Sequence, residues 1–424
     1  GAITFDQTGA QTLNVTNAAT TAGAITITNA GADLTVDTVT AGGGAGNNIT
    51  LTTSGGSGGI TIGNATATGA KVTVTAAEEI AENGVDIEAD ITAATIDLNA
   101  VTGIGAAGTL EITGATITAD STGVGNVDID SLATADVTVT TLTAGTGNIQ
   151  FDQTSTGGPW ALTVTTATTT DGTIALSNAG AKLTAATITA GGTKDITLTT
   201  TGAAGDVYVG NATATGAKVQ VNSVGAIEES GGDGGADISA TTIDLNAGTG
   251  IGAAATLEIA GTTITADSST SGNVDIDSIL ATAVTVTTLT TAGGGNIVFD
   301  QSGGGAVSFG TVSTGADGSP AEGEADITLT NTGADLTITT SATAAGLGDI
   351  VYTTTGAGNI ILTGTTTAAA DDVTITSAGT ITGAGLVTGA NVVLDSATGV
   401  GTGTAGRVRT AAGTLAARTT TSGG

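Results

Sequence analysis

The chain has 424 residues, 70 of them Gly, and 38 acidic against 7 basic residues give a formal charge of −31. Because Cys and His are absent, the composition excludes disulfide bonds, zinc sites built from Cys and His, and catalysis by Cys–His or Ser–His groups. The charge excludes a nucleic-acid partner and disfavours an anionic membrane surface. No apolar run approaches the ~18 residues of a membrane-spanning helix, so no membrane span is expected.

Copies of one long module follow each other along the chain. Ile3–Gln7 recurs as Ile149–Gln153 and again as Ile297–Gln301, and Thr95–Ala100 returns 147 residues later as Thr242–Ala247. Self-similarity at a fixed period is typical of repeat architectures. The sequence therefore predicts one continuous rod made of three modules, the third diverged and incomplete, over residues 1–148, 149–296 and 297–424.

Short strands are expected at apolar–x–apolar triplets, because strict alternation is the signature of half-buried strands. Every second triplet recurs after roughly 22–25 residues, a plausible length for one coil of a β-solenoid with two or three strands per turn. The predicted fold is therefore an all-β, single-stack β-solenoid of about 17 coils. In the first module the triplets are, in chain order, 3–5, 13–15, 25–27, 34–36, 49–51, 60–62, 72–74, 85–87 and 96–98.

Alternation also predicts where the side chains point. In Ile25–Thr28 the two isoleucines face one side of the strand and the two threonines the other. Coils stacked about 4.8 Å apart would join these apolar faces into one continuous core. We expect a narrow interior of Ile, Val, Leu and Ala without large rings, which agrees with an aromatic content of 2%.

Asparagines recur directly before strands, mostly after Gly. Asn tolerates the left-handed conformation and bonds to neighbouring backbone, so it suits a repeated corner. If the corners stack, their amides are expected to form a ladder along the solenoid axis. The predicted corner residues are Asn48, Asn126, Asn148, Asn273, Asn296 and Asn359.

The motif Thr95–Ala106 and its copy Thr242–Ala253 resemble repeats of large bacterial exoproteins of the filamentous haemagglutinin type, as does the segment Thr410–Arg418. The resemblance covers essentially the whole chain through composition and period. It implies a secreted, right-handed β-helix that serves as an adhesin shaft, a surface fibre or a matrix polymer. No binding residue carries over, because the matching segments are scaffold repeats.

Acidic residues cluster at matching places in the first two modules, and Asp90 and Asp237 lie near the ends of these two clusters. A Ca²⁺ site needs six to eight oxygens that converge on one point. Because charge runs are usually solvated, the first interpretation is a solvated acidic loop, with a weak Ca²⁺ site as the alternative and no other cofactor. The candidate ligands are Glu78, Glu79, Glu82, Asp86, Glu228, Glu229 and Asp233.

Two further patterns have a functional and a structural interpretation. Asp128 and Asp130, with their copies Asp275 and Asp277, offer paired carboxylates of the kind that glycosidases use. No His or basic residue accompanies them, so they are interpreted as outward-facing solubilising groups, and no catalytic residue is assigned. Rows of Thr-x-Thr have the spacing of ice-binding solenoids, but they occur on several strands of each coil and are interpreted as solubilising.

The sequence thus predicts a stiff, acidic, non-catalytic structural segment of an extracellular filament, surface fibre or matrix. Open solenoid ends expose unpaired backbone groups, and head-to-tail stacking generates an open filament. The expected partner is another copy of the chain or a longer parent chain, and carbohydrate or a cell surface is a further expectation. The alternative function is the shaft of a secreted adhesin; a carbohydrate-active enzyme and an ice-binding solenoid are minor alternatives.

Overall fold

The computed structural model describes residues 1–84, 86–155, 158–203, 205–232, 234–316, 323–401 and 406–421, and these residues form strands and no helix. The strands pair in parallel with the strands of the next coil, as in β4–β7 and β28–β30. Each of the two compact units, Gly1–Ala217 and Lys218–Gly424, is a stack of such coils. The predicted all-β solenoid is confirmed. The boundary between the units falls within β22 and does not coincide with a boundary between the sequence modules.

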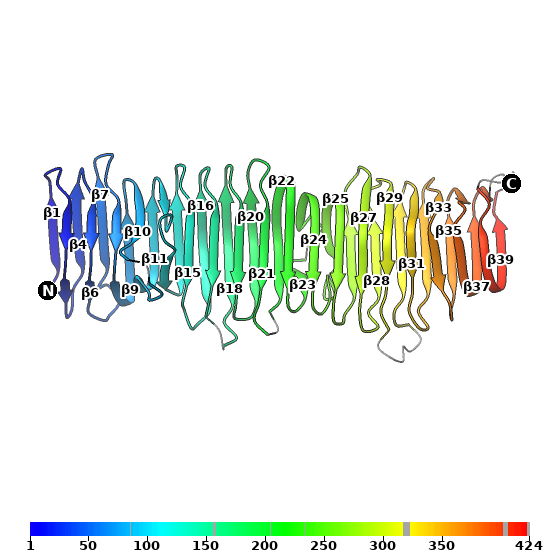
Figure 1. Cartoon of the computed structure of the whole chain (residues 1–424), viewed down its shortest axis with the longest axis horizontal. Helices are drawn as coiled ribbons and strands as arrows, with labels where there is room; N and C mark the ends of the chain where they lie inside the picture. Colours follow the sequence, from blue (N-terminus) through cyan, green and yellow to red (C-terminus); the bar gives the residue numbers. More distant parts are fainter. Residues whose placement is uncertain are drawn as a thin grey trace. The chain divides into compact units, whose positions relative to one another are not determined.

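Unit 1 places its strands side by side in successive coils (Figure 1). Its strands are β1 (Ile3–Gln7), β2 (Leu13–Val15), β3 (Ala18–Thr20), β4 (Ile25–Ala30), β5 (Leu34–Val36), β6 (Val39–Ala41), β7 (Ile49–Ser54), β8 (Ile60–Ile62), β9 (Ala65–Thr75), β10 (Glu79–Glu82), β11 (Ile91–Ala100), β12 (Gly103–Ile104), β13 (Leu110–Thr113), β14 (Thr116–Ser121), β15 (Val127–Ser131), β16 (Val137–Ala144), β17 (Ile149–Gln153), β18 (Leu162–Thr169), β19 (Ile174–Asn178), β20 (Leu183–Ala190), β21 (Ile196–Thr200) and the first part of β22 (Val207–Ser223).

Unit 2 repeats this arrangement after β22. Its strands are β23 (Ile227–Glu229), β24 (Ile238–Ala247), β25 (Leu257–Ser268), β26 (Val274–Ser278), β27 (Val284–Thr291), β28 (Ile297–Gln301), β29 (Val307–Ser313), β30 (Ile327–Thr332), β31 (Leu336–Thr343), β32 (Ile350–Thr355), β33 (Ile360–Leu362), β34 (Thr365–Ala368), β35 (Val373–Ser377), β36 (Thr380–Thr382), β37 (Leu386–Ser396), β38 (Gly399–Val400) and β39 (Arg409–Thr419).

The register between strands gives the length of a coil. Ile25 pairs with Ile49 and Ile49 pairs with Val72, at separations of 24 and 23 residues. The separation rises to 30 residues between Ile297 and Ile327. Counted over both units, the chain makes about 17 turns, as the period of the sequence predicts. The additional residues of this coil lie between β29 and β30.

The core of each unit is the inward face of its strands. In β4, Ile25 and Ile27 are buried while Thr26 and Thr28 are half-buried, and the same alternation recurs along most strands. Because the strands of successive coils pair in register over most of their length, inward residues lie above and below other inward residues. The hydrophobic effect then acts on a continuous apolar column, since no single coil could bury its own lining.

The interior also contains large rings, and this corrects the expectation that it would be too narrow for them. Phe151, Phe299, Phe309 and Tyr352 are all fully buried. Phe299 and Phe309 meet edge to face with their ring centres 5.3 Å apart. The Tyr352 hydroxyl forms a hydrogen bond with Thr366 Oγ1 at 3.3 Å, so its polar atom has a partner inside the core. The width of the coil therefore does not explain the scarcity of aromatic residues.

The six predicted corner asparagines bond to the backbone of the next coil. Asn126 Oδ1 accepts a hydrogen bond from the backbone N–H of Asn148 at 2.9 Å, and Asn148 Oδ1 accepts one from the N–H of Thr173 at 2.9 Å. The predicted ladder between amides is thus a ladder from amide oxygen to backbone N–H. The side chains of Asn48, Asn273, Asn296 and Asn359 accept in the same way from the N–H groups of Lys71, Asn296, Asp326 and Thr380.

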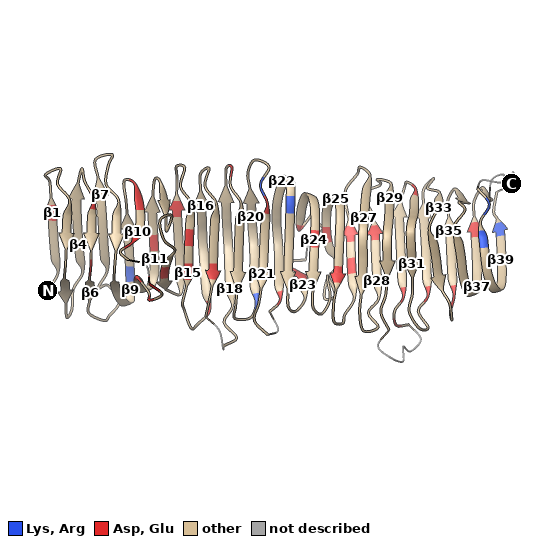
Figure 2. Ribbon diagram, viewed as in Figure 1, with Lys and Arg blue, Asp and Glu red and all other residues tan. Residues whose placement is uncertain are grey.

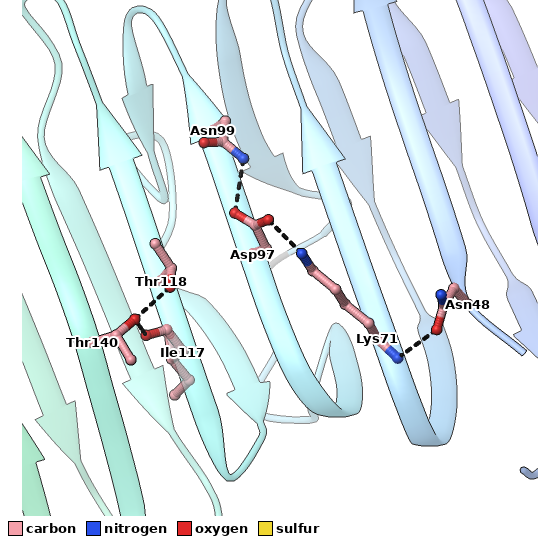
Figure 3. A network of polar contacts seen from close by, with 7 residues as sticks. All are labelled: Asn48, Lys71, Asp97, Asn99, Ile117, Thr118 and Thr140. Carbon is pink, nitrogen blue, oxygen red and sulfur yellow. Dashed lines mark hydrogen bonds and ion pairs between the residues drawn. The ribbon is translucent and has the colours of Figure 1, made fainter. Parts of the chain in front are cut away.

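Side-chain contacts between coils continue from these corners along the outer face (Figure 3). Asn48 Oδ1 accepts from the N–H of Lys71, and the Lys71 ammonium forms an ion pair with Asp97 Oδ2 at 2.7 Å. Asn99 Nδ2 donates to the other oxygen of Asp97 at 2.9 Å. Lys218 pairs with Asp244 at 2.6 Å, so unit 2 keeps the same ion pair. The contacts of Lys71 and Lys218 thus cross from coil to coil outside the apolar core, whereas the contact of Asn99 with Asp97 stays within β11.

A second set of polar residues closes the corners from inside, and the sequence analysis did not identify it. Asn178 is 0% exposed; its Nδ2 donates to the carbonyl of Lys182 at 2.8 Å and its Oδ1 accepts from the N–H of Gly180 at 2.8 Å. Asn29 and Asn331 bond in the same way to the carbonyl four residues later. Each buried amide thereby satisfies backbone groups that turn away from the strand ladder.

Replacing Phe299 by Ala is expected to lower the free energy of unfolding by about 3–5 kcal/mol, because it leaves a cavity beside Phe309. Phe5 occupies the equivalent place in the first module and is 47% exposed, so Phe5→Ala is the matched control and should cost less than about 1 kcal/mol. Urea unfolding followed by circular dichroism measures both. Equal losses would contradict the assignment of Phe299 to a packed core.

Replacing the buried Asn178 by Ala should destabilise the chain by about 2–3 kcal/mol, because the Gly180 N–H loses its acceptor and the carbonyls of Trp160 and Lys182 each lose one donor. The exposed corner residue Asn148 makes its contact in water, so Asn148→Ala should cost about 1 kcal/mol or less. The same urea titration compares the two variants. A larger loss for Asn148→Ala would show that the outer ladder, and not the inner amides, holds the corners.

Candidate functional site

Acidic residues gather around β10, β11 and β15 in unit 1 and around β24 and β28 in unit 2 (Figure 2). Of the candidate ligands in the first module, Glu78, Glu79 and Asp86 are exposed, whereas Glu82 is half-buried. Of those in the second, Glu228 is 6% exposed and Glu229 is 9% exposed, and Asp233 lies outside the described residues. The structure thus separates solvated acidic residues from buried ones.

Three carboxylates converge in unit 1. Glu82 ends β10, Asp90 directly precedes β11, and Glu111 lies in β13 of the next coil. One oxygen of each lies within 4.8 Å of an oxygen of the other two. We call this group triad 1. It lies where the chain leaves the solenoid in a loop between Glu82 and Asp90.

The same arrangement recurs in unit 2, where every member lies 147 residues further along the chain. Glu229 ends β23, Asp237 precedes β24, and Glu258 lies in β25, with one oxygen of each again within 4.8 Å of the others. We call this group triad 2. Two separate stretches of sequence therefore build one constellation.

The backbone holds each triad in place. In triad 1 the Asp90 N–H donates to the Glu111 carbonyl at 2.8 Å, and the Glu111 N–H donates back to Asp90 Oδ2 at 3.1 Å. Asp237 and Glu258 exchange the same two bonds at 2.8 and 3.1 Å. Glu82 Oε1 accepts from the N–H of Asp86 at 2.8 Å, which closes the loop between them. Strand pairing between coils thus brings the carboxylates together.

Burial and mutual repulsion disfavour the charged forms of these groups. Asp90 is 2% exposed, and burial, followed by the charges of Glu82 and Glu111, raises its pKa to about 8. Burial also raises the pKa of Glu111, with the charge of Glu82 as the next cause, and the pKa of Glu258 beside Glu229. Among the described residues, no ion pair involves Glu82, Asp90 or Glu111.

The sequence analysis identified Glu82 and Glu229 as candidate ligands, placed Asp90 and Asp237 in the acidic clusters, and missed Glu111 and Glu258. Both missed residues stand between two apolar residues of a strand, as in Leu110-Glu111-Ile112. Such a position resembles any outward-facing polar residue of a strand. The only available signal was that the Glu recurs at the module period, and its proximity to Asp90 depends on pairing between coils.

A third acidic group lies at a corner of unit 2, where oxygens of Asp349, Asp371 and Asp372 lie within 4.8 Å of one another. Asp349 Oδ1 accepts from the N–H of Asp372 at 3.0 Å, and Asp372 Oδ1 accepts from Asn391 Nδ2 at 2.6 Å. These are the corner contacts that Asn makes elsewhere. This group therefore belongs to the ladder of the corners.

The paired aspartates form columns of like charge across coils. Asp130 pairs in register with Glu111 on one side and with Asp152 on the other. Burial, followed by the charges of Asp152 and Asp128, raises the pKa of Asp130 to about 6. In unit 2 the corresponding column runs from Glu258 through Asp277 to Asp300. The aspartates of both columns are half-buried and alternate with buried apolar residues, as the sequence predicts, whereas Glu111 is buried.

Neither of two prominent hollows in the described part of the chain is lined by a titratable side chain. One, of about 470 Å³, lies against the first coil and is lined by Ile3, Phe5, Leu13 and Val15 among others. The other, of about 270 Å³, is lined by Thr, Ala and Gly of successive coils, including Thr92. The paired aspartates thus lie outside both hollows.

The Thr rows bond internally at one bulge of each unit. Thr118 and Thr140 share a hydrogen bond between hydroxyls at 2.6 Å, and Thr140 Oγ1 donates to the Ile117 carbonyl at 3.1 Å (Figure 3). Thr265 and Thr287 repeat the first contact at 2.6 Å. The register shifts at both places. These hydroxyls are therefore partly used within the protein.

No protein-family model, curated protein or solved structure matches the chain. The resemblance to exoproteins of the filamentous haemagglutinin type therefore remains a prediction from the sequence. No helix in the described part of the chain has the length and apolar character needed to cross a membrane.

Asp300 gives a test of the charge columns. Its Oδ1 is buried without a hydrogen-bond partner, and burial together with the charge of Asp277 raises its pKa. The native state therefore keeps the Asp300 carboxyl group protonated to a higher pH than the unfolded chain does. The resulting stabilisation is fully present below the unfolded pKa of about 3.9 and is lost as pH rises through the higher native pKa.

At pH 7, Asp300→Asn should therefore raise the free energy of unfolding by about 1 kcal/mol, and the gain should vanish near pH 4. Asp6 holds the equivalent place in the first module and is exposed, so Asp6→Asn should change little at either pH. Urea midpoints measured at both pH values provide the comparison. A gain that persists at pH 4 would contradict the electrostatic cause.

Proposed function

We propose that the chain is a structural segment of an extracellular filament, surface fibre or matrix, assembled by end-to-end stacking of solenoid coils. The observation that carries the proposal is a difference between equivalent residues. Phe151 and Phe299 are fully buried by the coils around them, whereas Phe5 of the first coil is 47% exposed. The coil that contains Phe5 thus offers an apolar surface that a further coil, of a longer parent chain or of another copy, would bury.

The occupant that we propose for this surface is the last coil of a second copy. The hollow of about 470 Å³ is lined by the apolar side chains of Ile3, Phe5 and Leu13, together with polar side chains such as Asn14. At the other end of the chain, Leu415 of β39 is 54% exposed, although its register partner Val392 is 1% exposed. Both surfaces carry strands whose parallel pairing can continue into another coil, so a head-to-tail contact would extend the sheet without closing it.

Charge supports stacking at the ends over contact along the sides. A net charge of −31 repels copies that approach side by side, and this repulsion is distributed along both units. Contact between coil faces buries apolar area and pairs backbone groups, which offsets that repulsion locally. The extracellular location follows from the resemblance to secreted exoproteins. The proposal includes no catalysis, because no His or basic residue accompanies the paired aspartates in the sequence.

Assembly by the full chain tests this function. In sedimentation velocity and negative-stain electron microscopy, the wild type should form species that lengthen with concentration, and Phe5→Asp should abolish them. Ile87→Asp adds the same charge at a side chain that is 86% exposed in a loop, so it should assemble as the wild type does. Wild-type chains that remain single at all concentrations would contradict the proposal and favour the adhesin shaft.

A further inference from the structure

We propose that triad 1 and triad 2 each bind one Ca²⁺ ion. The sites would be built from Glu82, Asp90 and Glu111 in unit 1 and from Glu229, Asp237 and Glu258 in unit 2. This inference is independent of end-to-end assembly. It concerns how neighbouring coils are held together within each unit.

The geometry of the triads fits a shared cation. Ca²⁺ binds oxygens at about 2.3–2.6 Å, so two oxygens on one ion can lie no more than about 5 Å apart. In each triad, one oxygen from every residue lies within 4.8 Å of the others, which meets this limit without movement of the backbone. Backbone carbonyls and water complete the shell in most such sites.

Glu111 supplies the observation that a solvated acidic loop does not explain. It is 8% exposed, and its Oε2 is buried without a hydrogen-bond partner. In triad 2, Glu258 Oε2 is likewise buried and without a partner. A buried carboxylate oxygen with neither a donor nor a cation is costly, and the cost grows when other carboxylates face it. A divalent ion between the three groups would satisfy these oxygens and their charges.

The ligand chemistry selects Ca²⁺ among the common cations. All three side chains offer oxygen, and neither His nor Cys is present in the chain, which disfavours Zn²⁺ and Cu²⁺. Mg²⁺ requires near-ideal octahedral geometry and retains most of its water, whereas Ca²⁺ accepts irregular sets of carboxylates and carbonyls. In each triad, backbone pairing fixes two ligands and a loop supplies the third. Such an irregular set suits Ca²⁺ better than Mg²⁺.

The ion would connect two coils. Glu82 and Asp90 stand at the two ends of a loop that leaves one coil, and Glu111 belongs to the following coil. Glu229, Asp237 and Glu258 have the same relation in unit 2. Binding would therefore link the residues at both ends of each loop to the next coil.

Isothermal titration of the full, chelator-treated chain with CaCl₂ at pH 7.5 tests the proposal. The wild type should bind two ions with dissociation constants of about 10⁻⁴ M, typical of extracellular modules. Glu111→Gln and Glu258→Gln should each bind one ion, and the double variant should bind none. Asp6→Asn/Asp120→Asn removes two carboxylates outside the triads and should still bind two ions.

Thermal unfolding with and without CaCl₂ separates ion binding from folding. In chelator, Glu111→Gln/Glu258→Gln should melt at or above the wild-type temperature, because it removes buried, mutually repelling charges. In 5 mM CaCl₂ the wild type should gain about 5 °C and the variant nothing, so their order reverses. A wild type without this gain, a gain shared by the variant, or a larger gain in MgCl₂ would each overturn the assignment.

Discussion

The parallel pairing of each strand with the equivalent strand of the next coil is the constraint on which the remainder of the structure depends. Within the paired strands it places most residues directly above a residue of the same position in the repeat, as in the column of Ile25, Ile49 and Val72. Inside the coil this arrangement is favourable, because apolar groups stack on apolar groups. A sequence of alternating β-branched residues is sufficient to produce it.

The same constraint is unfavourable for charge, because a carboxylate that recurs in the repeat also stacks on itself. Glu111, Asp130 and Asp152 form such a column, and the raised pKa of Asp130 records the cost. The molecule relieves this cost in several ways. Asp97 and Asp244 pair with lysines of the preceding coil, and the Ser177 hydroxyl donates to Asp152. At the corners, Asp and Asn oxygens accept backbone N–H groups.

In triad 1 the repulsion between the carboxylates is not relieved by an ion pair, since no ion pair among the described residues reaches Glu82, Asp90 or Glu111. A cation bound there would stabilise the contact between neighbouring coils of one chain. Contact between coil faces would instead join one chain to another. A secreted fibre with both features would gain stiffness within each chain and length from contacts between chains. The two properties rest on different residues, so each can be lost without the other.

The sequence by itself determined the solenoid, its coil length and its inward and outward faces. Alternation and a fixed period can be read along the chain, and the pairing of strands between coils follows them. It also marked Glu82, Glu229 and the six corner asparagines. Only the tertiary structure decided what these residues meet. Glu111 lies 29 residues from Glu82 in sequence and joins it through the advance from one coil to the next. The burial of Asn178 and of the four rings in the core likewise depends on the packing of neighbouring coils. A strand pattern specifies which face a side chain lies on, but not how much room the stacked coils leave inside.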